Sequence, residues 1–163
     1  MTSAITYTKT FTDQYDQPIR ELYKKVNDLM KVHPVFTQDV LNNKLQNPSA
    51  ISGDNSIWIA IDSSSNGKVV GIMCLEKMDN DTNELSTLSI LPEYRRKKIG
   101  STLLKMARQD KKIHLTCFGA NKAALNFYNT TDYSSTKEEH RHSQRTNVDY
   151  TLVHFNYNKI TEA

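Results

Sequence analysis

The sequence is poor in the residues that staple or interrupt small domains: its 163 residues include two cysteines, five glycines and four prolines. Two cysteines make no disulfide framework, and we expect Cys74 and Cys117, which lie in apolar runs, to pack as small buried side chains. No apolar run approaches the roughly 20 residues of a membrane-spanning helix. The N-terminus also lacks the basic start and apolar stretch of a signal peptide. These absences predict a cytoplasmic protein, with the nucleus as the alternative compartment, and no membrane partner.

Charge is nearly balanced, with 21 basic and 18 acidic residues and a formal net charge of +3. The charges are spread along the chain, so the composition does not argue for a nucleic-acid partner. A content of 37% hydrophobic residues is typical of a globular protein, and the length predicts a single domain over residues 1–163. His140 and His142 lack a well-placed third ligand, so we expect a solvated loop and no metal.

Hydrophobic periodicity predicts alternating strands and helices without an internal repeat or a linker. The polar stretch Ser134–Thr146 is expected to be a long loop or an extended hairpin. This order predicts a single α/β (α+β) domain. The expected elements are the strand Ile5–Phe11, a helix Ile19–Lys31, a second helix from Thr37 to Gln46, strands Ser56–Ile61, Lys68–Glu76 and Glu84–Leu91, a helix Ile99–Arg108, a strand Ile113–Phe118, a helix Asn121–Asn129, a short strand from Tyr133 and a strand Asn147–Phe155.

The most informative segment is the one in which a strand runs through Pro92 into the basic residues Arg95–Lys98 and a helix start at Ile99–Ser101. A helix N-terminus presents unpaired N–H groups and partial positive charge, and glycine lets backbone approach a ligand closely. Together these features predict a pyrophosphate site. The alternative is a solvated basic helix start.

This segment resembles the acetyl-CoA signature of the GNAT superfamily, Arg/Gln-x-x-Gly-x-Gly/Ala. Arg95 matches its first position and Gly100 its last, whereas Lys98 stands where the first glycine usually is. A side chain there could crowd the diphosphate or force a different loop path, although its ammonium could also reach a phosphate.

A second segment, Leu115–Tyr133, resembles the strand–loop–helix module of the same family. Asp132-Tyr133 replaces the usual Gly-Phe pair. The resemblance implies the GNAT fold, a mixed and mostly antiparallel sheet flanked by helices on both faces. The matching residues are Asn121, Ala123, Ala124, Phe127 and Tyr128.

The resemblance also implies acetyl-CoA as co-substrate, bound where the strands Glu84–Leu91 and Ile113–Phe118 splay apart. Backbone groups of Leu88, Ser89 and Ile90 would pair with the pantetheine arm, and Asn121 would contact that arm from the opposite side. The residues implied for the pyrophosphate are Arg95, Arg96, Lys97, Lys98, Ile99, Gly100 and Ser101.

Two side chains are implied in catalysis. Tyr128 would donate a proton to the leaving sulfur, since a phenol remains neutral and can donate at pH 7. A core aromatic is the alternative for Tyr128, but Phe127 is expected to fill that position better. Glu84 would deprotonate the amine, as in the histone-lysine branch of the family, and a water chain is the alternative base.

The implied reaction is direct acetyl transfer to a primary amine in a ternary complex. The acceptor is a small amine, a protein lysine or a protein N-terminus. The alternative from another class is a non-catalytic CoA-binding sensor or interaction module, which Lys98 keeps open. Tyr23, His33 and Phe36 are candidates for lining the acceptor site. Nucleic-acid binding through Arg95–Lys98 is disfavoured, because one basic run without interleaved aromatics is a poor signal.

Overall fold

The computed structural model describes residues 4–9, 15–30, 56–108, 112–144 and 147–157. The helix predicted from Thr37 and the side chains of Tyr23, His33 and Phe36 lie outside the described part of the chain.

The described elements follow the predicted order, with boundaries mostly within two residues of the predicted ones. They are β1 (Ile5–Thr8), α1 (Asp16–Met30), β2 (Ser56–Asp62), β3 (Lys68–Lys77), β4 (Thr82–Ile90), the 3-10 helix η2 (Pro92–Tyr94), α3 (Ile99–Ala107), β5 (Lys112–Phe118), α4 (Lys122–Asn129), β6 (Ser134–Ser143) and β7 (Val148–Tyr157).

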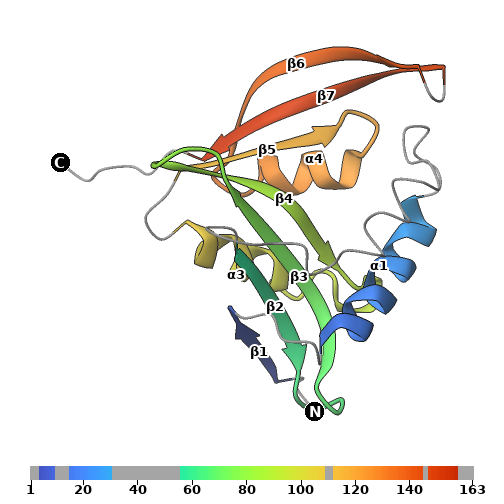
Figure 1. Ribbon diagram of the computed structural model, residues 1–163, viewed down its shortest axis with the longest axis vertical. Helices are drawn as coiled ribbons and strands as arrows, with labels where there is room; N and C mark the ends of the chain where they lie inside the picture. The colour runs from blue at the N-terminus through green and yellow to red at the C-terminus, as the bar shows by residue number, and fades with distance from the viewer. Residues whose placement is uncertain (1–3, 10–14, 31–55, 109–111, 145–146, 158–163) are drawn as a thin grey trace.

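The described strands form one mixed sheet in the order β1-β2-β3-β4-β5-β7-β6, in which β4 and β5 are parallel and the other described neighbours are antiparallel. Helix α1 contacts β3 and β4, and α3 contacts β2, β3 and β4. Figure 1 shows these two helices on opposite sides of the sheet, with α4 beside β5. This is the predicted fold class, a mostly antiparallel sheet with helices on both faces.

The hairpin between β2 and β3 is confirmed. Asn66 and Gly67 take positive φ angles of 53° and 69°, the conformation that tight hairpin turns require.

The β6–β7 hairpin decides between the two predictions for the polar stretch after Tyr133. Ser134–Ser143 is a strand of ten residues that pairs antiparallel with β7, so the stretch is an extended hairpin and not a loop. Almost all of its side chains are exposed. As the outermost strand of the sheet it carries charged side chains, which disfavour pairing with another chain.

The parallel pairing of β4 with β5 is short, and this positions the candidate site. Only three residue pairs join the two strands, and the last is Glu84 with His114. Beyond Glu84, β4 continues to Ile90 along β3, whereas β5 pairs with β7 as far as Phe118. The two strands therefore splay apart, as predicted.

A buried carboxylate links the core sheet to the turn after β4. Asp62, at the end of β2, is only 2% exposed. It accepts hydrogen bonds from Ser64 N–H at 3.0 Å and Ser64 Oγ at 2.6 Å, and from Tyr94 Oη at 2.6 Å. These bonds, those of Ser64 most, hold the pKa of Asp62 below its ordinary value.

Replacement of Asp62 by Asn should therefore reduce the loss of unfolding free energy that occurs as the pH falls. A depressed folded-state pKa contributes stability above the ordinary value, about 3.9, and this contribution is lost as pH falls through the folded-state pKa. Urea unfolding at pH 7, 4 and 3 should show the wild type losing more stability than Asp62→Asn over this range. Parallel losses in the two proteins would exclude the linkage.

Candidate active site

The part of β4 that no longer pairs with β5 begins with a β-bulge. Leu85 pairs with Leu75 and Thr87 with Cys74, so the residue between Leu85 and Thr87 has no counterpart in β3. Such an extra residue bends a strand and increases its twist. Here it lies just beyond Glu84, where β4 separates from β5.

Beyond the bulge, successive residues of β4 direct their backbone N–H and C=O groups alternately toward β3 and toward the gap between β4 and β5, which we call the splay. Leu91 N–H donates to Val70 O at 2.9 Å, so Ser89, two residues earlier, also directs its N–H and C=O toward β3. Leu88 and Ile90 consequently direct theirs toward the splay. An extended ligand added at this edge would bond Leu88 and Ile90, and Ser89 only through its side chain.

The turn after β4 carries the basic run and two left-handed residues. Arg96 and Lys98 have φ angles of 60° and 64°. Lys98 is the N-cap of α3 and makes no capping bond through its side chain. The first helical bond runs from Thr102 N–H to Lys98 O at 3.0 Å. The N–H groups of Ile99, Gly100 and Ser101 therefore have no intrahelical acceptor, which is the arrangement that binds anions.

Two cations of this run contact the turn itself. Arg95 Nε donates to Ile90 O at 3.3 Å, and Lys97 Nζ lies 5.1 Å from the centre of the Tyr94 ring. Tyr94 is the residue bonded to Asp62, so the turn is anchored to β2. Arg96 and Lys98 extend as exposed side chains.

Gly100 serves packing as well as backbone access. A Cβ at this position would lie 3.3 Å from Phe127 Cζ and 3.7 Å from Phe127 Cε2. The absent side chain thus lets α4 approach the start of α3. This contact joins the two predicted motif segments at the same end of the molecule.

Asn121 is the N-cap of α4. Its Oδ1 accepts a bond from Ala124 N–H at 3.2 Å, and its own N–H donates to Phe118 O at 2.9 Å. These bonds fix the side chain just beyond the end of β5, across the splay from β4. The amide nitrogen of Asn121 is the donor that would be available for the predicted contact with a cofactor arm.

Tyr128 and Phe127 exchange the roles expected of them in the core. Tyr128 is 7% exposed and packs against the rings of Phe127, Tyr133 and Phe155, with centroid distances of 5.1, 5.6 and 5.7 Å. Phe127 is only partly buried. The expectation that Phe127 is the better core residue is wrong, because Phe127 faces Gly100 while Tyr128 faces β5 and β7. Burial raises the pKa of Tyr128, so its hydroxyl stays neutral.

Glu84 has a partner that the sequence reasoning missed. Its Oε2 lies 3.7 Å from His114 Nδ1, and His114 Nε2 lies 3.0 Å from His154 Nδ1. The alternation of the strand Ile113–Phe118 carries a usable signal, since Ile113 and Leu115 are buried and His114 points to the other face. His154 could not be found this way, since it lies 40 residues further along the chain.

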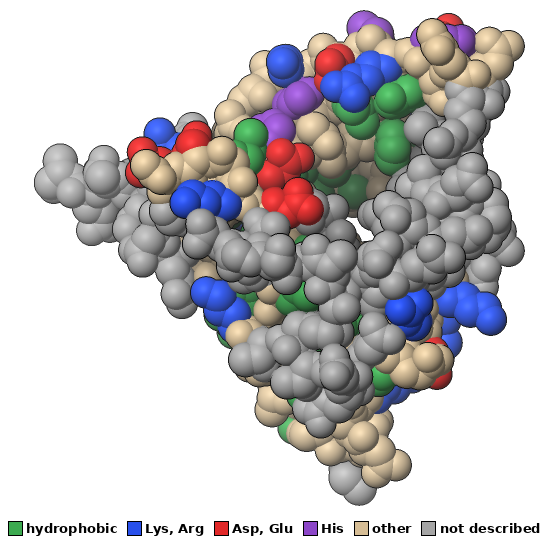
Figure 2. Space-filling model, in the orientation of Figure 1, with side chains coloured by type: hydrophobic (Ala, Val, Ile, Leu, Met, Phe, Trp, Pro, Cys, Tyr) green, Lys and Arg blue, Asp and Glu red, His purple; other side chains and the backbone are tan. Residues whose placement is uncertain are grey.

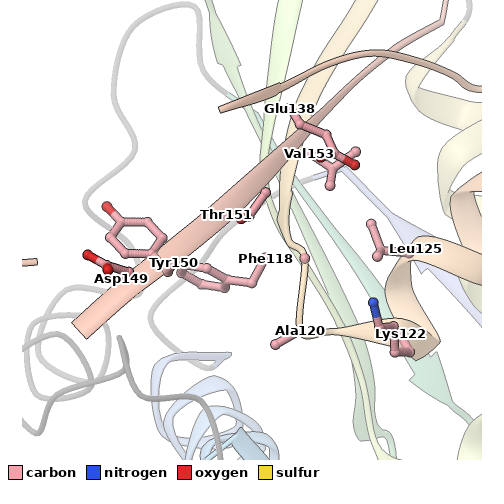
Figure 3. Close-up of a pocket in the computed structure, with 10 residues that line it drawn as sticks. Phe118, Ala120, Lys122, Leu125, Glu138, Asp149, Tyr150, Thr151 and Val153 are labelled. Carbon is pink, nitrogen blue, oxygen red and sulfur yellow. The ribbon is translucent and has the colours of Figure 1, made fainter. Parts of the chain in front are cut away.

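A cavity of about 470 Å³ lies where β5 ends, between the start of α4 and the β6–β7 hairpin. Figure 3 shows Phe118 beside Tyr150, and Lys122 and Leu125 extending from α4. None of the predicted site residues lines it.

The other candidate groups have structural surroundings. Cys74 and Cys117 are both buried, and burial raises the pKa of Cys117 to about 12, which disfavours a reactive thiolate. His142 contacts Asp149 at 2.7 Å on the exposed hairpin. Within the described ranges, no group of three or more His, Cys, Asp or Glu side chains is arranged to hold a metal ion. No helix there is both long and apolar enough to cross a bilayer.

Comparison with known proteins decides the family. The family model described as Acetyltransferase (GNAT) family matches residues 14–133, which include the splay, the basic turn and α4. The chain belongs to the GNAT family of acetyltransferases. No curated protein sequence matches it significantly.

Solved GNAT structures share its fold over almost the whole chain. A GNAT acetyltransferase from Staphylococcus aureus Mu50 is 19% identical, with a TM-score of 0.70, and the match covers 95% of this chain and 100% of that one. For the PaiA N-acetyltransferase of Thermoplasma acidophilum in complex with coenzyme A these values are 16%, 0.68, 96% and 99%. For the ribosomal-protein-S18-alanine N-acetyltransferase of Escherichia coli they are 13%, 0.67, 94% and 93%.

The two departures from the GNAT motifs share one backbone property. Lys98 and Asp132, which stand where the family usually has glycine, both take positive φ angles, 64° and 41°. Asp132 lies within 3.5 Å of Arg108. Both side chains are thus accommodated without abandoning a backbone conformation that glycine adopts freely. Lys98 therefore adopts a left-handed conformation that a glycine at this position could also take.

Lys98→Gly should stabilise the protein by about 1 kcal/mol, because the left-handed conformation costs a lysine about that much. Lys98→Ala is the matched control, since it removes the ammonium and keeps the strain. Denaturant midpoints of the three proteins should show a gain for the glycine variant alone. An equal gain in Lys98→Ala would assign the effect to charge instead.

Proposed function

We propose that this GNAT chain transfers an acetyl group from acetyl-CoA to a primary amine, by direct attack in a ternary complex. The observation that supports this most is the early end of β4–β5 pairing at Glu84. It leaves the backbone groups of Leu88 and the N–H of Ile90 directed toward the splay, next to the start of α3, whose N-cap makes no side-chain hydrogen bond.

The residues present fit acetyl-CoA. Leu88 and Ile90 offer backbone groups to an extended amide-bearing arm. The N–H groups of Ile99, Gly100 and Ser101 and the exposed cations Arg96 and Lys98 fit a pyrophosphate. The PaiA N-acetyltransferase of Thermoplasma acidophilum was solved in complex with coenzyme A, which supports the same ligand class here.

The chemistry then divides among three groups. Glu84, 35% exposed at the start of the splay, takes a proton from the acceptor ammonium. A backbone N–H on β4 beyond the bulge donates to the thioester oxygen and stabilises the charge that develops there. Tyr128 donates its phenolic proton to the sulfur as the C–S bond breaks, and the second proton that the nitrogen loses on becoming an amide restores the phenol. Burial keeps Tyr128 neutral before this step.

The acceptor site lies on the face that carries Glu84. Glu76 and Glu84 are directly opposite each other on β3 and β4, and two carboxylates on one face favour a cationic amine. A small amine, a protein lysine and a protein N-terminus all meet this requirement, and we propose a small amine as the acceptor to test first.

Isothermal titration with acetyl-CoA tests the proposal first, with dephospho-CoA and ATP as controls. We expect micromolar affinity for acetyl-CoA, followed by CoA release with members of an amine library. Binding without turnover of any amine would favour the non-catalytic CoA-binding module. Absence of acetyl-CoA binding would exclude both the acetyltransferase and the non-catalytic CoA-binding module.

A further inference from the structure

A chain of ionisable side chains crosses four strands of the sheet, starting at Glu84. His114 on β5 contacts Glu84 on β4 at 3.7 Å and His154 on β7 at 3.0 Å. His154 Nε2 in turn lies 3.1 Å from Glu139 Oε1 on β6. Figure 2 shows histidine and acidic side chains gathered on one face, close to a hollow. This row of four side chains thus runs from the point where β4 and β5 separate to the exposed β6–β7 hairpin.

The Glu139 end sets the direction of the hydrogen bonds. Bonds from His154 and then from Arg141 hold the pKa of Glu139 below its ordinary value, so the carboxylate is ionised and can only accept. His154 Nε2 must therefore carry a hydrogen. In neutral His154 the other nitrogen, Nδ1, is then an acceptor.

The same reasoning gives the tautomer of His114, the next residue of the row. Since His154 Nδ1 accepts, His114 Nε2 must donate across the 3.0 Å contact. Neutral His114 is then left with an unprotonated Nδ1. That atom is buried and has no hydrogen-bond partner within the part of the chain that the structure describes. Its nearest acidic neighbour is Glu84 Oε2. Two acceptors thus face each other at 3.7 Å, a separation that has to shorten before a proton on either atom can be hydrogen-bonded to the other.

Charged residues are distributed unevenly around this row of four side chains. Glu76 lies opposite Glu84 on β3 and adds negative charge. Lys137 on β6 lies opposite His154, and Arg141 is bound to Glu139. The cations thus lie at the hairpin end of the row, beside Glu139, whereas Glu76 and Glu84 lie at its other end.

We propose that His114 is the positioning partner of Glu84: His154 and Glu139 hold it in the tautomer whose bare Nδ1 faces Glu84. The pair retains the proton that leaves the acceptor ammonium, while the amine nitrogen forms its bond to the acetyl carbon. This rests on the proposed function for its role in turnover. The tautomer itself does not.

The tautomer is tested without activity, by long-range ¹H–¹⁵N correlation spectra of the full chain with labelled histidine at pH 8. His114→Asn and His154→Asn assign the signals. We expect His114 and His154 both to carry hydrogen on Nε2, and Glu139→Ala to abolish that preference. A hydrogen on His114 Nδ1 in the neutral ring would overturn the proposal.

The role in turnover is tested by the pH dependence of kcat/KM with an amine that the wild type acetylates. In His114→Asn we expect the acid limb of this profile to move to lower pH by about one unit or more, with roughly tenfold lower kcat/KM at pH 7. Acetyl-CoA affinity should not change. Glu139→Ala should reproduce the shift, and Glu139→Gln, which keeps an acceptor oxygen, should rescue it.

Three further outcomes are decisive. His140 lies on the same hairpin but contacts Thr151 and is not part of the row from Glu84 to Glu139. The pH profile of His140→Asn should therefore match that of the wild type. An active wild type whose profile is unchanged in both His114→Asn and Glu139→Ala would overturn the role of His114. A wild type that binds acetyl-CoA but acetylates no amine would overturn the proposed function and this role together, while the spectra still decide the tautomer.

Discussion

Tyr128→Phe should lower kcat about 100-fold and leave the dissociation constant of acetyl-CoA within a factor of about three. A general acid contributes roughly 10²–10⁴ to a rate, and the substitution removes only the hydroxyl. The ring would keep its contacts with Phe127, Tyr133 and Phe155, so the fold should persist. Steady-state kinetics and titration with acetyl-CoA on the same preparation separate the two quantities.

Tyr133→Phe is the matched control for this experiment. Tyr133 is 5% exposed, and its ring lies 5.6 Å from that of Tyr128. Its buried hydroxyl lies near the Arg108 guanidinium but makes no hydrogen bond of standard geometry in the part of the chain that the structure describes. Removing that hydroxyl should leave kcat unchanged and should not reduce stability. Equal losses in both variants, or equal losses of kcat and affinity in Tyr128→Phe, would make Tyr128 a core aromatic only.

The strands and helices with a strong apolar period were predictable from sequence. β3 is buried over most of its length, and α3 buries Ile99, Leu103, Leu104 and Ala107, so burial sets their boundaries. Strand β6 was not determined in this way. Ser134–Ser143 has no apolar residue, and its extended form follows from pairing with β7.

The candidate site likewise has features that could be predicted from the sequence and features that could not. The basic turn, Asn121 and the splay follow from motif segments that are local in sequence. The contact of His114 with His154 does not, because it depends on β7 lying between β5 and β6 in the sheet. The conformation of Lys98 was also hidden, since a lysine in place of glycine predicts either a tolerated strain or a new turn path. Only backbone geometry separates those two results.

Glu84→Gln should lower kcat/KM by a factor of about 100 or more at pH 7, with unchanged affinity for acetyl-CoA. The amide keeps the volume and polarity of the side chain but cannot accept the ammonium proton at this pH. The defect should shrink as pH approaches the pKa of the acceptor amine, because a free amine needs no base. A loss of constant size across the pH range would instead indicate that Glu84 orients the acceptor or the strand.

Glu76→Gln provides a closely matched control. Glu76 lies directly opposite Glu84 on the adjacent strand, so the substitution removes the same charge from the same face, one strand further from the splay. If the negative field alone draws the amine in, both variants should raise KM to a similar extent and leave kcat near the wild-type value. If Glu84 accepts the proton, kcat should fall in Glu84→Gln alone. A water chain acting as base through neither carboxylate would leave kcat unchanged in both, and Glu84 would then lose its role.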